Sequence, residues 1–420
     1  MSVQEIKLKN GLRLVVDPMP GLESVALGVW AGAGARVERP EEHGIAHLLE
    51  HMAFKGTRRR TARAIVEEIE SVGGHLNAAT GYERTGYYAR VLKGDVDLAL
   101  DLLSDILRAP LLAEADLARE QDVVVQEIGE ARDEPGDYVF DLLQSAAWGD
   151  HTLGRPILGT QESVRAQTPD SLAAFMGRHY GADNLVLAAA GAVDAEAFAK
   201  AAETVFADWP HAGHGGARVA ATFQGGARSA ARTSEQMHLA LSFPGFGVAD
   251  PLYYASRVFA EALGGGMSSR LFQTVREERG LAYSVYAYAD PYADAGALGV
   301  YAGADPARAG EVPSLVIDEI RAMAERPEAA EVDRARAQLK SALLMSQESP
   351  AARAESAAGQ THVFGRVTPL PDLADRIDAV DAAAVAACAE KALSAPLALA
   401  AVGGGEAAFD YAVIDALRAR

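Results

Sequence analysis

The stretch HGIAHLLEHMAFKGT, residues 43–57, decides the fold and the chemistry that we expect from this chain. Its apolar residues recur with helical spacing, yet the same run contains His47, Glu50 and His51. Residues four apart project from one side of a helix, so the two imidazoles would point to one place. Glu50 follows His47 by three residues and lies near the same face. We therefore predict a helix that is partly core and partly a chemical site.

Two imidazoles at this spacing supply part of a zinc site, and the order H-x-x-E-H is the inverzincin motif. A catalytic zinc also needs a third protein ligand and one open position. The segment LAREQDVVVQEIGEARDEPGD, residues 117–137, offers Glu120 and Glu127 two helical turns apart on one face. We predict Glu127 as the third ligand and Glu120 as a partner that orients a ligand from behind. Taken alone, the two glutamates would more often mark a solvated helical face.

The composition is that of a soluble protein with more than one core. The chain has 420 residues, of which 49% are hydrophobic and 23% charged, so it is long enough for two domains and too apolar for disorder. Its formal net charge of −19 repels nucleic acid and anionic membranes and favours cationic partners such as basic peptides. The alternative interpretation is that the negative net charge serves only to keep the protein soluble.

Features that report on location favour the cytoplasm. Cys388 is the single cysteine, so neither an internal disulfide nor a cysteine-ligated metal site is expected. The first residues, MSVQEIKLKNGLRLVVDPMPG, alternate as a strand does and lack the apolar core of a signal peptide. No run approaches the roughly 20 apolar residues that span a bilayer. We expect a cytoplasmic protein with no membrane or nucleic-acid partner.

The hydrophobic pattern divides the chain into two halves with a similar order of elements, which indicates an internal duplication. We place a zinc-binding catalytic domain at 1–212, a Gly- and Ala-rich linker at 213–232, and a homologous domain at 233–420. The expected fold class is α+β, in which each domain is a mixed, mainly antiparallel sheet flanked by helices. Expected strands include 25–30, 75–92, 238–243, 282–288 and 299–302, and expected helices include 61–72, 96–107, 114–132, 252–263, 268–279, 311–324 and 330–347.

The second half has no counterpart of the polar triplet. RVFAEALGGGMSSR, residues 257–270, stands where the opening helix stands in the first half, and it contains no histidine. If the halves are duplicates, only the first one kept a metal site.

On these residues the chain resembles the pitrilysin-type (insulysin) metallopeptidases, and most closely their mitochondrial processing peptidase branch. The resemblance covers nearly all of the first half and continues into the second. Its segments are GIAHLLEHMAFKGT (44–57), GGHLNAATGYERTGYY (73–88), EQDVVVQEI (120–128), GRPILGT (154–160), DNLVLAAAGAVD (183–194) and LGGGMSSRLFQTVREERGLAYSV (263–285).

The resemblance implies one zinc ion per chain, bound by His47, His51 and Glu127. It makes Glu50 the general base for attack by a zinc-bound water. Asn77 and Ala78 would lie on an edge strand to which an extended peptide adds its own strand.

Further substrate contacts are implied by the same resemblance. Phe54 would help to form the pocket for the residue after the cut. Asp137 and Asp141 would receive an arginine upstream of the cut, although both also fit a surface helix. Arg276 and Tyr283 match the family's Arg/Tyr pair, which reaches the substrate and the developing oxyanion.

We therefore expect a zinc-dependent metalloendopeptidase that cleaves short or unfolded, basic peptides. The chain is about half as long as the fused members of the family, which implies a homodimer or a heterodimer with a related zinc-free chain. Two other functions stay open: a scaffold or assembly subunit that keeps the fold without catalysis, and a peptide-binding module that does not cut.

Overall fold

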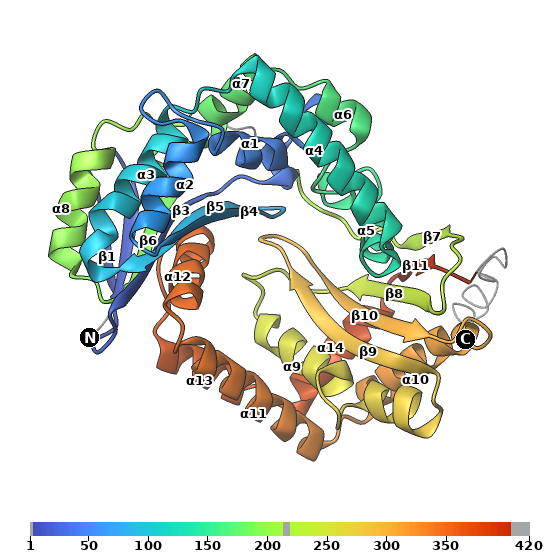
Figure 1. The fold of residues 1–420 in the computed structure, drawn as a ribbon. Coiled ribbons are helices and arrows are strands. Elements are labelled where there is room, and N and C mark those ends of the chain that lie inside the picture. Colours follow the sequence, from blue (N-terminus) through green and yellow to red (C-terminus); the bar gives the residue numbers. More distant parts are fainter. Residues whose placement is uncertain (1–2, 213–218, 405–420) are drawn as a thin grey trace. The chain divides into compact units, whose positions relative to one another are not determined.

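The computed structural model describes residues 3–212 and 219–404, which fold into two compact units (Figure 1). Unit 1 takes its described residues from Met1–Ile128, Pro156–Arg218 and Met345–Thr368. Unit 2 takes its described residues from Gly129–Arg155, Val219–Leu344 and Pro369–Arg420. None of the described helices combines the length and the hydropathy that a membrane span requires.

Unit 1 is built on a six-stranded sheet in the order β1-β2-β6-β3-β5-β4. Its β2 and β6 run parallel, and its other neighbouring strands are antiparallel. The strands are β1 (Gln4–Lys7), β2 (Arg13–Pro18), β3 (Ser24–Ala31), β4 (His75–Thr80), β5 (Thr85–Leu92) and β6 (Leu185–Gly191). The helices are α1 (Ile45–Ala53), α2 (Ala62–Ser71), α3 (Val96–Arg108), α4 (Glu114–Asp133), α6 (Gln161–Arg165), α7 (Pro169–His179), α8 (Ala195–Phe206) and α12 (Pro350–Phe364).

The two faces of this sheet are covered by different helices. Successive side chains of a strand point to opposite faces. Leu14 and Val16 of β2 accordingly lie in the large core with α1, α3 and α8. Val15 lies between them in sequence but packs with Trp30 and the alanine-rich α12. Helix α1 is thus held against one face of the sheet by a core that extends over most of unit 1.

Unit 2 has a five-stranded sheet in the order β7-β11-β8-β10-β9. The strands are β7 (Gly226–Ala230), β8 (Met237–Pro244), β9 (Ala282–Pro291), β10 (Gly296–Ala304) and β11 (Ala398–Val402). The helices are α5 (Pro135–Trp148), α9 (Tyr253–Gly264), α10 (Val312–Glu325), α11 (Ala329–Ser346), α13 (Leu370–Asp378) and α14 (Ala382–Leu393), with a π-helix at Phe272–Glu278.

The duplication expected from the sequence is visible in the strand order. The series β7-β11-β8-β10-β9 matches β2-β6-β3-β5-β4 position by position, and the first pair is parallel in both sheets. All remaining pairs in the two series are antiparallel. The predicted fold class, two homologous domains with mixed sheets flanked by helices, is confirmed.

Each unit also contains one helix from the other half of the sequence. Helix α5 packs on β11, β8 and β7 of unit 2, and α12 packs on the equivalent β6, β3 and β2 of unit 1. The compact units are therefore discontinuous, in contrast to the continuous ranges 1–212 and 233–420 expected from the sequence. The apolar pattern of a helix shows which of its faces is buried but not which sheet covers that face.

Two local differences from the expected elements have simple causes. Strand β7 lies inside the segment 213–232 that was expected to be a linker, and its side chains are mostly exposed. An edge strand that buries little leaves no apolar alternation to detect. The helix expected at 268–279 is a π-helix over Phe272–Glu278, a rare form that periodicity does not separate from an α-helix.

Candidate metal and catalytic site

Helix α1 carries three of the predicted site residues and is fixed at its start by a buried carboxylate. Glu38 accepts hydrogen bonds from the backbone N–H groups of Gly44 and Ala46, both at 2.9 Å. These N–H groups would otherwise lack partners at a helix start. Gly44 has φ of 87°, and a Cβ atom there would meet the backbone of Leu158 and Gly159. The position of α1 is therefore set by contacts with segments before and after it.

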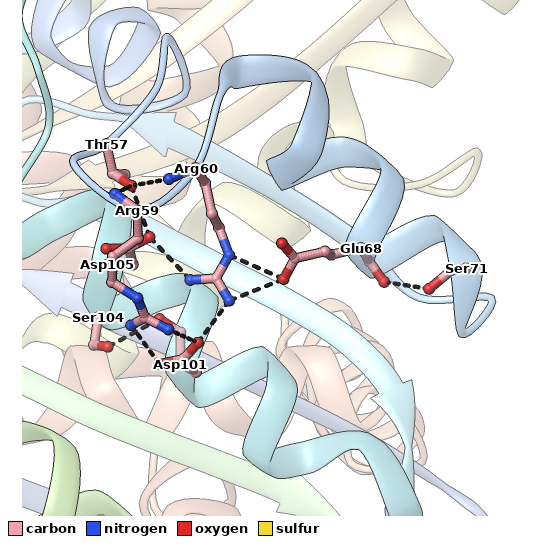
Figure 2. Close-up of polar contacts among 8 residues, drawn as sticks. All are labelled: Thr57, Arg59, Arg60, Glu68, Ser71, Asp101, Ser104 and Asp105. Atoms are coloured by element: carbon pink, nitrogen blue, oxygen red, sulfur yellow. Dashed lines mark hydrogen bonds and ion pairs between the residues drawn. The ribbon is translucent and has the colours of Figure 1, made fainter.

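Figure 2 shows a charged network that fixes the loop following α1 to α3 and α2. Thr57 donates a hydrogen bond to Asp105 at 2.8 Å. The guanidinium of Arg60 contacts three carboxylates at 2.6–2.9 Å, namely those of Glu68, Asp101 and Asp105. The side chain of Arg60 is only 8% exposed and that of Asp105 only 3%. Arg60 and Asp105 are therefore withdrawn from water and depend on each other. Glu68 and Asp101 are 39% and 33% exposed, and Asp101 also pairs with Arg59.

Replacing Arg60 with methionine should destabilise unit 1 by about 3–5 kcal/mol, because it leaves the buried carboxylate of Asp105 without its cation. Arg63→Met is the matched control, since Arg63 pairs with Glu67 on the exposed side of α2. An exposed pair of this kind contributes less than about 1 kcal/mol. Thermal and urea unfolding measure both variants. If Arg60→Met and Arg63→Met lower the free energy of unfolding by equally small amounts, the network in Figure 2 does not hold the loop.

The predicted ligand atoms converge. His47 and His51 lie on α1, Glu127 lies on α4, and one ligand atom from each lies within 4.8 Å of the others. The Nε2 atoms of His47 and His51 are 3.9 Å and 3.6 Å from Oε2 of Glu127. Ligands around a tetrahedral zinc with bonds of about 2.0–2.1 Å are separated by about 3.3 Å. The two distances to Glu127 therefore exceed the spacing around a bound zinc by only a few tenths of an ångström.

The electrostatics at these residues also fit a metal. Burial, together with the nearby His51, lowers the pKa of His47 to about 4. His47 is therefore neutral near pH 7, with a lone pair available for a cation. Its Nδ1 atom is buried and has no hydrogen-bond partner among residues 3–212 and 219–404. The distances above involve the opposite nitrogen, Nε2, which faces Glu127.

Glu120 stands behind His51, where the sequence predicted an orienting partner. Its Oε2 is 3.1 Å from Nδ1 of His51, and its Oε1 is 2.7 Å from the ammonium of Lys55. A proton on Nδ1 that is donated to Glu120 leaves the Nε2 lone pair of His51 facing Glu127. Sequence reasoning missed Lys55, which lies just after the end of α1 and meets Glu120 from another helix.

We expect Glu120→Gln to weaken zinc binding about 10- to 100-fold, as the loss of an outer partner of a ligand usually does. Competition with a calibrated chelator gives the affinity. Glu114→Gln is a suitable control because Glu114 is exposed on the same helix. If Glu120→Gln binds zinc as tightly as wild type, the contact with Glu120 does not orient the His51 ring for metal binding.

Glu50 lies beside the ligand atoms but outside their set. Its Oε2 accepts a hydrogen bond of 2.5 Å from the hydroxyl of Thr80, at the end of β4. Burial raises the pKa of Glu50, and the Thr80 hydrogen bond and the charge of His51 partly oppose that effect. A carboxylate with a raised pKa is a stronger proton acceptor than an exposed one.

The residues predicted to contact a peptide backbone lie at the edge of the unit 1 sheet. Among the described strands, β4 pairs with β5 alone, so no strand covers its other edge. The backbone N–H of Ala78 donates to Oδ1 of Asn77 at 2.9 Å. Asn77 is exposed on this strand, and Ala78 faces the core. The ring of Phe54, at the end of α1, lies 6.3 Å from that of Tyr87.

The two predicted aspartates lie on α5 and therefore belong to unit 2. Burial raises the pKa of Asp141 to about 6, with Arg132 opposing the shift and Asp137 adding to it. The ionised form of Asp141 is thus poorly stabilised by its surroundings. A cation bound beside Asp141 would stabilise its ionised form.

The predicted Arg/Tyr pair is in contact within unit 2. The guanidinium of Arg276 lies between two rings, 4.6 Å from the centre of Phe272 and 5.1 Å from that of Tyr283. Arg276 is on the π-helix and Tyr283 on β9, and the phenol is 75% exposed. Both line a cavity of about 440 Å³ together with Glu235 and Asp305. Nε of Arg276 also lies 3.9 Å from Oε1 of Glu277, and the Arg276 side chain is 37% exposed.

Comparisons with known proteins show the family of this chain. Residues 14–161 match the family model described as Insulinase (Peptidase family M16), and residues 167–339 match that of the Peptidase M16 inactive domain. A Rickettsia bellii protein named a zinc protease is 41% identical over 361 residues, which cover 86% of this chain and 87% of that protein. The zinc protease YmxG of Bacillus subtilis is 40% identical over 83% of this chain and 85% of its own length.

The fold comparison gives the same picture. A crystal structure of a protease from Helicobacter pylori superposes with a TM-score of 0.89 at 20% identity, covering 96% of this chain and 99% of that one. The chain belongs to peptidase family M16, the insulinase family. The family resemblance read from the sequence is confirmed, and the processing peptidase branch stays a prediction.

Proposed function

We propose that this protein is a zinc-dependent endopeptidase in which His47, His51 and Glu127 bind the metal and Glu50 is the general base. The observation that carries the proposal is the convergence of the three ligand atoms within 4.8 Å, with the carboxylate of Glu50 held beside them by Thr80. Relatives named zinc proteases support the choice of metal.

Each protein group has a defined part in hydrolysis. When bound, zinc supplies a Lewis acid that polarises the scissile carbonyl and acidifies water. Glu50 accepts a proton from the attacking water and passes it to the leaving amine. By the family resemblance, Arg276 and Tyr283 bind the substrate and the developing oxyanion.

We propose short or unfolded basic peptides as substrates. An extended peptide adds to the open edge of β4 through main-chain hydrogen bonds, which are indifferent to sequence. Selectivity must then come from side-chain pockets, with Phe54 contributing to the pocket after the cut. Asp137 and Asp141 are proposed to bind an arginine, in keeping with the formal net charge of −19.

The assembly and location are proposed on the sequence alone. One zinc per chain follows from one ligand set in the first half. A homodimer, or a heterodimer with a zinc-free relative, follows from the chain's length relative to fused family members. The cytoplasm remains the predicted location.

The direct test combines metal analysis with peptide cleavage. The purified protein is expected to contain about one zinc per chain and to cut a mixture of unfolded peptides, as followed by mass spectrometry. Removal of zinc with a chelator should stop the cutting, and added zinc should restore it. A protein that binds no zinc and cuts nothing would favour the scaffold function, and peptide binding without cutting would favour a binding module.

Replacing Asp141 with asparagine should stabilise unit 2 at high pH and weaken any preference for arginine. Because the folded-state pKa of Asp141 is about 6 against 3.8 for the free group, ionisation costs stability as the pH rises through this range. The variant should gain up to about 3 kcal/mol at pH 8, and that gain should disappear as the pH falls to about 4. Unfolding at both pH values measures the first effect, and cleavage of arginine- and citrulline-containing peptides measures the second. A stability gain that is the same at both pH values would contradict a raised pKa for Asp141.

A further inference from the structure

Thr80 contacts the proposed base directly and has no assigned function. Its hydroxyl donates to Oε2 of Glu50 at 2.5 Å. We infer that Thr80 is the positioning residue that orients Glu50 for proton transfer. The inference rests on the proposed function, because it concerns the base of that reaction.

The backbone around Thr80 is fixed on both sides, so its hydroxyl has a defined place. Thr80 pairs with Thr85 across the β4–β5 ladder, and the buried Thr85 donates to the carbonyl of Ala33 at 2.9 Å. The next residue, Gly81, donates to Arg84 and accepts from Ala35 through its backbone. A strand end held by these bonds does not need the hydroxyl of Thr80 for its own structure.

The direction of the side chain follows from strand geometry. Alternate residues of β4 face opposite sides of the sheet. Ala78 is buried and Thr80 is half-buried on one side, whereas Asn77 and Ala79 are exposed on the other. Helix α1 packs against β4, and Glu50 lies on that helix. Thr80 is therefore the hydroxyl that this strand presents to the base.

The hydroxyl contact fixes one oxygen of Glu50. Oε2 accepts a hydrogen bond from the Thr80 hydroxyl, and the backbone of Thr80 also hydrogen-bonds to the carboxylate. In the inferred arrangement, Oε1 is the oxygen that accepts the proton from water. A glutamate side chain has several rotatable bonds, and a carboxylate without this anchor would sample other rotamers. A hydrogen bond to a charged group is strong enough to select one orientation.

The contact also links substrate binding to the base. The same strand presents Asn77 and the open backbone edge proposed to receive the peptide. One rigid element would then set both the register of the peptide and the orientation of Glu50. Positioning of this kind matters because small errors in the placement of a reacting group lower the rate strongly.

The test compares Thr80→Val, which keeps the shape but removes the hydroxyl, with Thr80→Ser, which keeps the hydroxyl. We expect kcat to fall about 10- to 100-fold in Thr80→Val, less than the roughly 10²–10⁴-fold that a general base itself contributes, because the base is misplaced but not removed. KM and zinc affinity should stay within about twofold of wild type, and Thr80→Ser should recover most of kcat. Thr204→Val, in which an exposed helical hydroxyl is lost, should behave as wild type.

A double-mutant cycle with Glu50→Gln decides whether Thr80 acts through the base. Thr80→Val should lower kcat little further when Glu50 is already glutamine. Three results would overturn the inference: wild-type kcat in Thr80→Val, equal losses in the valine and serine variants, or a tenfold loss of zinc affinity. Wild-type protein that cuts nothing would instead refute the proposed function.

Discussion

Glu50→Gln should lower kcat for peptide cleavage by about 10²–10⁴-fold while leaving zinc bound, because the amide cannot take a proton from water. The substitution is nearly isosteric, so the amide oxygen can still accept the hydrogen bond from Thr80. Glu50 is not one of the three converging ligand residues. Loss of activity should therefore occur without loss of metal.

The measurement is single-turnover cleavage of one defined basic peptide, with zinc content determined on the same sample. Glu67→Gln is the control, since Glu67 is exposed on α2 and pairs with Arg63. A Glu50→Gln variant that cuts at the wild-type rate would remove Glu50 as the base. A variant that has also lost its zinc would place Glu50 among the ligands.

Glu127→Gln should weaken zinc binding by more than about 100-fold, beyond the loss caused by removing an outer partner of a ligand. A neutral amide is a much poorer ligand for zinc than a carboxylate, and two imidazoles alone bind the ion weakly. Activity measured at low zinc should vanish for this reason. A large excess of zinc should restore only part of it.

Chelator competition measures the affinity, and Glu114→Gln serves as the control on the same helix. Comparison with Glu120→Gln separates a ligand from an orienting partner, because the expected loss is smaller there. Equal affinities in wild type and Glu127→Gln would show that the closeness of Glu127 to the two imidazoles has no chemical consequence.

Local pattern was sufficient for much of the site and the fold. His47, Glu50 and His51 share one helix, so their relative positions follow from helical geometry. The strong periodicity of α3 and the continuous apolar run of β3 likewise placed these elements to within a few residues. Duplication was readable because each half repeats the same order of apolar segments.

Contacts between distant segments were not readable in the same way. Thr80 is thirty residues from Glu50, and its side chain meets that carboxylate only because β4 packs against α1. Lys55 was overlooked because its importance depends on Glu120, which comes from another helix. The exchange of α5 and α12 between the two sheets has no local signature, since either sheet offers an equivalent apolar face.

By itself, the sequence determined the helical spacing of two imidazoles and a carboxylate, the strands and helices around them, and the repetition of this order. Those properties depend on neighbours a few residues apart, which the backbone places in a fixed relation. The tertiary structure brought the predicted ligand Glu127 to His47 and His51, and it alone decided that Thr80 contacts Glu50 and which sheet covers α5 and α12. Such pairings depend on how separate elements pack together, and the spacing of residues along the chain leaves that choice open.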